Sequence, residues 1–299
     1  MTLLVQDMLA PAKVNLRLRI VGRRIDGYHL VDSIMVPVSL FDELHVEVAP
    51  RRGSIRSQPP ITVTSDSETA PGGRSNLAYR AAAIYLAAAG RSLGVHINLV
   101  KRIPVGSGLG GGSSDAAAVL LVLNRILGSP LSTDSLCRLA AQLGADVPFF
   151  VHGRPARIRG IGEQVTPLQG DWSVPLVLCS DGQPLSTALV YSRVRLSSLT
   201  SEQPASSIPR FVDGRTLISQ VLANDLEKAA AEIHPGVLSL KAMLTDQGAL
   251  AALMTGSGSA VFGVWPDLRN ARSAARRLRE LGLWAEAVET LNASPAVQN

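Results

Sequence analysis

Residues 104–114 contain the residue types that could bind a phosphate group. The run reads Pro-Val-Gly-Ser-Gly-Leu-Gly-Gly-Gly-Ser-Ser, between a strand-like run at 95–101 and an apolar helix-forming run at 116–123. Backbone without a Cβ can lie close against a ligand, and the first N–H groups of a helix point unpaired toward an anion. We therefore expect a phosphate cradle here. The alternative is a tight turn with Ser113 or Ser114 as an ordinary N-cap, which would explain only one serine and one glycine.

The common nucleotide-binding motifs do not fit this run. A Walker A loop needs a lysine directly after its glycines, and none follows here. A dinucleotide-binding fingerprint could be placed on Gly106, Gly108 and Gly111, but it requires an acidic residue about twenty positions further on, after a second strand. The segment that follows instead reads as helix to Gly128 and then as a second helix. Both a P-loop NTPase and a Rossmann dehydrogenase are disfavoured.

Phosphoryl transfer also needs a cation near the transferred group and a base for the acceptor hydroxyl. Lys13, in Pro-Ala-Lys-Val-Asn at 11–15, is one of four lysines among 29 basic side chains and is the candidate cation. An exposed strand lysine is the alternative. Asp146 is followed by Val-Pro-Phe-Phe, and these apolar neighbours predict a partly desolvated carboxylate. An N-cap or turn aspartate is the alternative for this residue.

A second glycine run, Thr-Gly-Ser-Gly-Ser at 255–259, connects two apolar strand-like segments. It could be a plain hairpin turn or a place where the backbone approaches a ligand. The presence of two glycine clusters in one chain favours the second interpretation.

The elements that must position these residues can be read from periodicity and turn residues. Extended segments are expected at 12–21, from the Asp26-Gly27 turn through 39, and at 44–48, 61–64, 95–101, 156–162, 174–179, 253–265 and 284–290. Helices are expected at 76–89 with Ser75 as cap, after the glycine run, and at 133–143, 186–194, 225–233, 235–245 and 268–281. Residues 51–60 and 197–214 read as exposed loops. Strands and helices mix without strict alternation, which predicts an α+β fold with mostly antiparallel sheets.

Composition limits the class of protein. The chain has 299 residues, 46% hydrophobic and 18% charged, which is typical of a globular protein with a sizeable core. No apolar run is long enough to span a bilayer, and the first residues do not resemble a signal peptide. Cys137 and Cys179 lie in apolar contexts without metal-ligand spacing, which predicts buried thiols in a cytoplasmic protein.

The net charge of +5 leaves nucleic acid as a possible partner. The densest cluster of basic residues comprises Arg269, Arg272, Arg276, Arg277 and Arg279, interleaved with alanine and leucine at helical spacing, which is typical of a solvated helix face. Few aromatic residues are available for stacking on RNA. A non-catalytic RNA-binding protein, with steeply salt-dependent binding, is therefore the less favoured class, because it leaves Lys13 and Asp146 without a joint task. We expect no nucleic-acid and no membrane partner.

Three motifs, in order, resemble those of the GHMP kinases: residues 11–16, the run at 104–114, and Met-Thr-Gly-Ser-Gly-Ser at 254–259, where threonine stands in place of the usual serine. Within that superfamily, Asp-Gly-Tyr-His at 26–29 and Gly-Ala-Asp-Val-Pro-Phe-Phe at 144–150 are similar to motifs of the 4-diphosphocytidyl-2-C-methyl-D-erythritol kinases. Gly-Leu-Gly-Gly-Gly-Ser-Ser-Asp-Ala-Ala, within the phosphate run and its helix, belongs to the same pattern. The resemblance covers nearly the whole chain.

The resemblance implies two domains, 1–158 like the second domain of ribosomal protein S5 and 159–299 ferredoxin-like. It implies phosphorylation by ATP, with Mg²⁺ expected, of the 2-hydroxyl of a cytidine-diphosphate-linked methylerythritol in the non-mevalonate isoprenoid pathway. Asp146 would be the base and Lys13 the cation that steadies developing charge. No residue stands out as a metal ligand.

The resemblance also assigns binding residues. The ATP-binding residues would be Asn76, Pro104, Val105, Gly106, Ser107, Gly108, Leu109, Gly110, Gly111, Gly112, Ser113 and Ser114. The acceptor-binding residues would be Asn15, Tyr28, His29, Thr187, Tyr191, Gly256 and Ser257, with the two tyrosines on either side of the cytosine and His29 at its edge. Another GHMP kinase, of the homoserine or mevalonate type, is the alternative within the superfamily.

Overall fold

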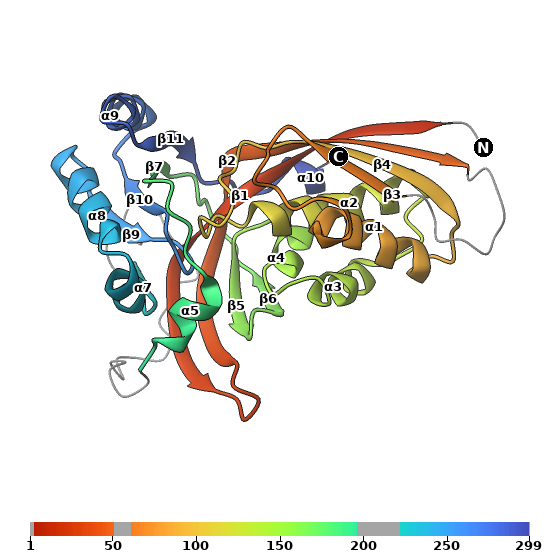
Figure 1. The fold of residues 1–299 in the computed structure, drawn as a ribbon, viewed down its shortest axis with the longest axis horizontal. Coiled ribbons are helices and arrows are strands. Elements are labelled where there is room, and N and C mark those ends of the chain that lie inside the picture. Colours follow the sequence, from red (N-terminus) through yellow and green to blue (C-terminus); the bar gives the residue numbers. More distant parts are fainter. Residues whose placement is uncertain (1–2, 51–60, 196–221, 299) are drawn as a thin grey trace.

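The computed structural model describes residues 3–50, 61–195 and 222–298, which form two β-sheets side by side with helices packed on each (Figure 1). The strands are β1 (Leu4–Arg23), β2 (His29–Pro50), β3 (Ile61–Ser65), β4 (Leu93–Val100), β5 (Ala156–Gly160), β6 (Gln164–Pro167), β7 (Pro175–Ser180), β8 (Ala223–Asn224), β9 (Ala251–Met254), β10 (Val261–Val264) and β11 (Trp284–Glu289). The helices are η1 (Gly73–Ser75), α1 (Leu77–Ala88), α2 (Gly111–Ile126), α3 (Thr133–Ala141), α4 (Val147–His152), α5 (Thr187–Ser192), α7 (Glu227–Ile233), α8 (Gly236–Asp246), α9 (Leu268–Glu280) and α10 (Pro295–Gln298). Most strand pairs are antiparallel, so the predicted α+β class is confirmed.

The larger sheet is built around β1 and β2, which pair antiparallel along nearly their whole lengths. Its strand order is β3-β4-β2-β1-β8, and β5 and β6 extend from β2. The sequence predicted shorter strands at 12–21 and 44–48. The first is a segment of β1 and the second a segment of β2, because the backbone hydrogen bonds between the strands continue past the interruptions in the apolar pattern. The turn between these strands contains Gly27 at φ 91°, as its Asp-Gly sequence predicted.

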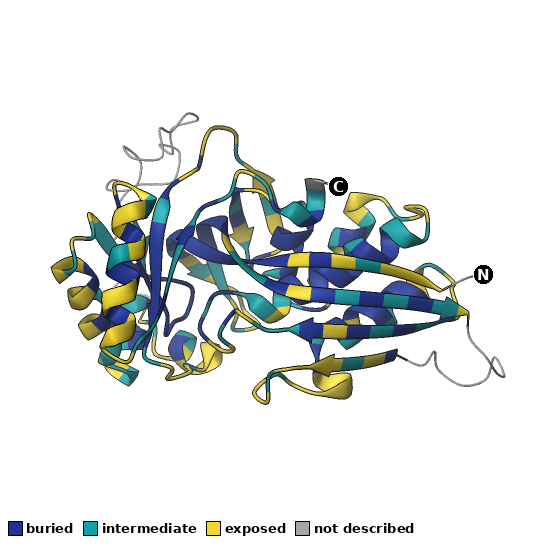
Figure 2. Ribbon diagram, turned by 90° about the horizontal axis from the view of Figure 1, so that it is seen from above, coloured by how far each residue is buried: buried dark blue, intermediate teal, exposed yellow. Residues whose placement is uncertain are grey.

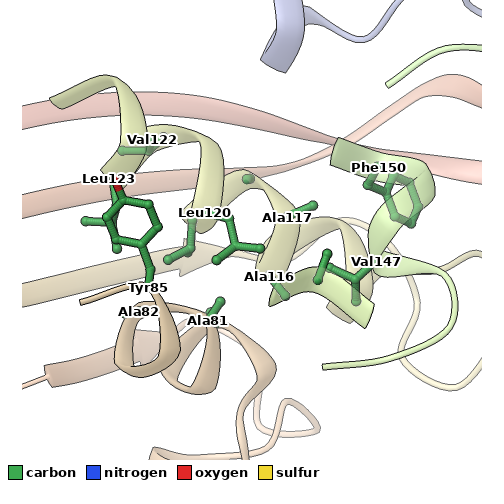
Figure 3. Close-up of a cluster of buried hydrophobic side chains, with 14 of the residues drawn as sticks. Ala81, Ala82, Tyr85, Ala116, Ala117, Leu120, Val122, Leu123, Val147 and Phe150 are labelled. Atoms are coloured by element: carbon green, nitrogen blue, oxygen red, sulfur yellow. The ribbon is translucent and has the colours of Figure 1, made fainter. Parts of the chain in front are cut away.

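Helices α1 to α4 pack on one face of the larger sheet and bury the main hydrophobic core. Along β4 and the part of β2 paired with it, buried and less buried residues alternate, as expected where one face is covered (Figure 2). The middle of β1 and β2, at 10–16 and 31–38, is buried without alternation because both faces are covered there. Figure 3 shows Tyr85 of α1 beside Leu123 of α2, with Val147 and Phe150 of α4 near the first turns of the same helix. This packing fixes the N-terminal end of α2, which follows the glycine run.

Two helices next to the glycine run begin at residues other than those predicted. Asn76 caps α1, because its side chain accepts from the N–H of Ala78, whereas Ser75 belongs to the preceding 3-10 turn. Helix α2 already begins at Gly111, after Gly110 in the left-handed region at φ 78°, a conformation that glycine adopts without strain. Residues 111–114 are therefore helical, and the alternative of an N-cap serine at the end of the run is wrong.

The smaller sheet has the order β11-β7-β10-β9 and is wholly antiparallel. One of its faces, with Leu178 and Phe262, packs on Val14 and Ile34 of the larger sheet. Its other face packs on α7, α8 and α9. The shared core between the sheets holds the loop between β9 and β10 against the middle of β1.

Several predictions about the rest of the chain have mixed outcomes. The loops at 51–60 and 197–214 lie outside the described residues. The domain boundary at 158/159 falls inside β5, which pairs with β2 and β6, and the division stays a prediction.

Cys179 is buried, Cys137 is half-buried, and both are free thiols. The arginines of α9 are exposed and its alanines are buried, so this helix face is solvated as predicted. Among the described helices, none is long and apolar enough to cross a membrane.

Candidate active site

The two glycine runs, the start of α2 and the middle of β1 surround one cavity of 390 Å³ where the two sheets meet. This volume suits a small-molecule ligand. The cavity lining includes most of the site residues that the sequence predicted, namely Lys13, Asn15, Asn76, Pro104, Val105, Gly106, Ser107, Gly108, Gly110, Gly111, Gly112, Ser113, Asp146, Thr187, Tyr191, Gly256 and Ser257. Leu109 and Ser114 are buried, and they do not belong to the lining, nor do Tyr28 and His29.

The first glycine run has the conformation that a phosphate cradle requires. Gly106, Gly108 and Gly110 have φ angles of 71°, 82° and 78°. The first intrahelical bond of α2 runs from the Ser114 N–H to the Gly110 carbonyl at 2.9 Å. The N–H groups before it have no partner within the helix, and the residues that carry them line the cavity. Together with the positive end of the helix dipole, they provide a site for an anion.

The second glycine run packs directly on the first. A Cβ added to Gly108 would lie 2.6 Å from the Thr255 carbonyl oxygen, which is closer than real Cβ atoms come. The Ala260 N–H donates to the Ser107 carbonyl at 3.0 Å. The loop from β9 to β10 is therefore a hairpin turn and also a wall of the cavity, so the two interpretations of this run are compatible.

Lys13 and Asp146 meet in the cavity. The Lys13 side chain is 4% exposed, and its Nζ lies 3.5 Å from Asp146 Oδ2. The same Nζ donates to Asn15 Oδ1 at 2.6 Å. The alternative of an exposed strand lysine is therefore wrong.

The Asp146 side chain is 37% exposed and lines the cavity, so the carboxylate is partly desolvated, as predicted. It lies in the turn before α4, at the N-cap position, but its side chain makes no capping hydrogen bond. Its carboxylate remains available for a ligand hydroxyl.

Hydrogen bonds to both sheets fix Asn15. Its Nδ2 donates to Ser33 Oγ at 2.8 Å, and its backbone N–H donates to Thr255 Oγ1 at 3.0 Å. The threonine in the second glycine run therefore supplies a contact between the sheets. This network orients the Asn15 amide oxygen toward the Lys13 ammonium.

Aromatic rings border the cavity beside α5. The rings of His29 and Tyr191 have their centroids 5.4 Å apart, at an angle of 38°. Burial and then the charge of Arg23 lower the pKa of His29, so its imidazole is neutral at pH 7. Tyr28 is 61% exposed on the turn between β1 and β2. Nearby, the hydroxyls of Thr187 and Ser257 lie 2.8 Å apart.

The cavity lining also contains four apolar residues, Pro71, Leu77, Leu99 and Ile103, which we call the apolar slot. Asn76 belongs to the same lining. The Asn76 Nδ2 donates to the Pro71 carbonyl at 2.8 Å, so this side chain also braces the wall of the slot. The slot could accept the flat base of a nucleotide whose phosphates lie on the glycine run.

Sequence reasoning missed three charged residues beneath the phosphate loop. Lys101 Nζ contacts Asp42 Oδ2 and lies 2.6 Å from Asp115 Oδ2. All three side chains are at most 6% exposed, and Lys101 and Asp115 belong to the cavity lining. A signal was present, since Lys101 and Asp115 flank the glycine run and the aspartate interrupts an otherwise apolar helix pattern.

Burial raises the pKa of Asp115 to about 7, against the attraction of Lys101. Burial alone would lower the pKa of Lys101, and the two carboxylates overcome this and raise it. The cluster therefore couples a cation to two acids whose side chains are almost fully buried.

The described residues contain no group of three His, Cys, Asp or Glu side chains that could hold a metal ion. Asp115 Oδ1 is buried without a hydrogen-bond partner, and Asp115 is the one acid of this cluster among the lining residues. The chain thus offers no ready-made metal cage here.

Comparisons with known proteins agree with this geometry. Residues 76–154 match the family model of the GHMP kinases N terminal domain, and residues 212–282 match that of the GHMP kinases C terminal region. A 4-diphosphocytidyl-2-C-methyl-D-erythritol kinase from Syntrophotalea carbinolica is 43% identical over 288 residues, which are 96% of this chain and 99% of that protein.

Solved structures extend the comparison. The crystal structure of a 4-(cytidine 5'-diphospho)-2C-methyl-D-erythritol kinase is 41% identical and matches with a TM-score of 0.80, over 95% of this chain and 99% of that one. A homoserine kinase from Cytophaga hutchinsonii matches with a TM-score of 0.69 over 98% and 96% of the two chains. Its identity is 19%, so it shares the fold alone. By sequence and structure, this chain belongs to the GHMP kinases and, among them, to the 4-diphosphocytidyl-2-C-methyl-D-erythritol kinase family.

Proposed function

We propose that this chain transfers the terminal phosphoryl group of ATP to the 2-hydroxyl of 4-diphosphocytidyl-2-C-methyl-D-erythritol, a step in the formation of isoprenoid precursors. One observation carries the proposal more than any other: Lys13 Nζ and Asp146 Oδ2 lie 3.5 Å apart beside a glycine loop with free N–H groups. Phosphoryl transfer depends on positioning and electrostatic stabilisation, and these parts supply both.

In the proposed reaction, ATP lies with its base in the apolar slot and its phosphates on the N–H groups of 110–113. The acceptor oxygen attacks the terminal phosphorus while the bond from that phosphorus to the bridging oxygen of ADP breaks. The acceptor proton passes to Asp146. Lys13 stabilises the negative charge on the attacking oxygen, and its bond to Asn15 Oδ1 holds it in place.

The acceptor would be recognised by the residues of the cavity that lie beside α5. The neutral imidazole of His29 can both donate to and accept from the edge of a cytosine. Tyr191 and the exposed Tyr28 could stack on its faces, and the hydroxyls of Thr187 and Ser257 could reach polar atoms of the sugar or diphosphate. These residue roles are part of the proposal.

Mg²⁺ is also part of the proposal. A magnesium ion commonly keeps several waters and binds through phosphate oxygens, and there it would neutralise charge on the transferred group. We assign no residue of this chain as its ligand. A cytoplasmic location is proposed as well, on the basis of the two free thiols Cys137 and Cys179.

A panel of acceptors incubated with γ-labelled ATP tests this function. We expect label to appear in the cytidyl compound and not in homoserine or mevalonate. Labelling of homoserine or mevalonate alone would replace the proposal with the alternative GHMP activity.

A further inference from the structure

A single buried carboxylate contacts both ends of the phosphate loop. Asp42 Oδ1 accepts from the backbone N–H of Arg102 at 2.6 Å and of Ile103 at 2.9 Å, just before the loop begins. At the other end, a Cβ added to Gly111 would lie 3.1 Å from Asp42 Oδ2, so the first residue of α2 rests on this carboxylate. Asp42 itself comes from β2 and is fully buried.

Lys101 completes the connection. Its Nζ contacts Asp42 and donates to Asp115 Oδ2 at 2.6 Å, and Asp115 lies in the second turn of α2. The ammonium group therefore joins the end of β4 to the helix across the base of the loop. Without this cation the two buried acids could not both stay ionised, because unpaired charges inside a protein are costly. One of them would take up a proton, and the ionic link between the two ends of the loop would be lost.

The surroundings of the loop give this link a specific task. The loop itself holds three glycines with positive φ, and its middle is held by the second glycine run and by the buried side chain of Leu109. These contacts do not set the separation of its two ends, where the backbone freedom of glycine is greatest. Its N–H groups can converge on a phosphate only if the strand end and the helix start are held at a fixed separation.

We propose that Lys101, acting through Asp42 and Asp115, is a positioning residue that holds the phosphate loop in the shape that binds ATP. The inference rests on the proposed binding of ATP phosphates by 104–114. It assigns Lys101 no contact with the transferred group. Cutting the link should therefore weaken ATP binding and leave the acceptor site unchanged.

The test measures the Kd for ATP by titration calorimetry without acceptor, and the KM of both substrates. For Lys101→Met and for Asp115→Ala we expect the Kd and the KM for ATP to rise by about tenfold or more, while the KM for the acceptor stays within about twofold. The Kd for ATP of the double variant should exceed that of Lys101→Met by no more than about threefold, because the same link is already broken in the single variant.

The control is Arg157→Met. Arg157 donates two hydrogen bonds of 2.8 Å to Asp32. Like Lys101→Met, this change removes the cation that pairs with a buried aspartate, but neither Arg157 nor Asp32 lines the cavity. Its Kd for ATP should match that of the unmodified chain. Thermal unfolding of every variant reports the general loss of stability separately.

Three results would overturn the inference. The first is an unchanged Kd for ATP in Asp115→Ala. The second is tighter ATP binding in that variant, which would mean that Lys101 acts on the phosphates directly, and the third is a loss of ATP affinity in Arg157→Met as large as in Lys101→Met. If Lys101→Met does not fold, the Kd of Asp115→Ala alone tests the inference. If the unmodified chain phosphorylates the acceptor and the variants bind ATP normally, this inference is refuted and the proposed function stands. If the unmodified chain does not phosphorylate the acceptor but the variants lose ATP affinity, the proposed function is refuted and this inference stands.

Discussion

Gly256 lies against the ammonium group of Lys13: a Cβ added at this glycine would stand 3.1 Å from Lys13 Nζ and 3.0 Å from the Gly108 carbonyl oxygen. The smaller sheet thus supplies backbone that closes over a side chain from the larger sheet. The Lys13 side chain is therefore positioned by both halves of the molecule.

Gly256→Ala should therefore reduce turnover. Its φ of 58° is unfavourable for alanine, and the new methyl group would press on Lys13 and the phosphate loop. We expect kcat to fall by about tenfold or more, as is common when reacting groups shift by a fraction of an ångström.

Gly128→Ala is the matched control, because Gly128 has a φ of 80° with nothing within 4 Å of its added Cβ. It should lower the free energy of unfolding by about 1–2 kcal/mol and leave kcat unchanged. Equal kcat values for the two variants would show that the crowding at Gly256 has no catalytic consequence.

The acceptor site gives a second prediction. Tyr191→Ala should raise the KM for the cytidyl acceptor by about 5- to 100-fold, since stacking on a base contributes about 1–3 kcal/mol. Tyr28→Ala should act in the same direction and less strongly, because Tyr28 is 61% exposed before the acceptor binds. The KM for ATP is the internal control in both variants. Unchanged acceptor KM values in both would remove the stacking assignment.

The buried acid beneath the loop predicts how stability depends on pH. Burial raises the pKa of Asp115 from its ordinary value of 3.8 to about 7 in the folded chain, so the folded state binds more protons between these values. Its contribution to the free energy of unfolding is complete below the lower value and is lost as the pH rises through the upper one. Urea titrations of Asp115→Asn from pH 5 to pH 8 should show a flatter profile than those of the unmodified chain. Parallel profiles would contradict the raised pKa.

Much of the site could be predicted from the sequence because its backbone conformation requires glycine at particular positions. The glycines at 106, 108 and 110 are needed for positive φ, and Lys13 stands out as one of only four lysines among 29 basic residues. These features are local, so composition and spacing reveal them. The meeting of Lys13 with Asp146 is not local, and only the resemblance to a family linked them before the structure was known.

What the sequence did not reveal depends on long-range contacts. The pairing of Lys101 with Asp42 bridges 59 positions, and no periodicity marks a buried charge whose partner lies on another strand. The direction of the Asp146 side chain could not be read from the sequence either, because its apolar neighbours, Val147 to Phe150, turn into the core while the carboxylate lines the cavity. The continuity of β2 was likewise set by its two neighbouring strands rather than by its own pattern.

Transfer of labelled phosphate from ATP to the cytidyl acceptor by Asp146→Asn tests the central claim most directly, with Asp246→Asn, an exposed aspartate at the end of α8, as the control. We predict that kcat falls by about 10²- to 10⁴-fold in Asp146→Asn, because the acceptor hydroxyl loses its base, while the Kd for ATP changes by less than about threefold. The control should keep full activity. Ordinary turnover with weakened ATP binding in Asp146→Asn would contradict the account, because Asp146 would then serve the nucleotide and not the acceptor hydroxyl.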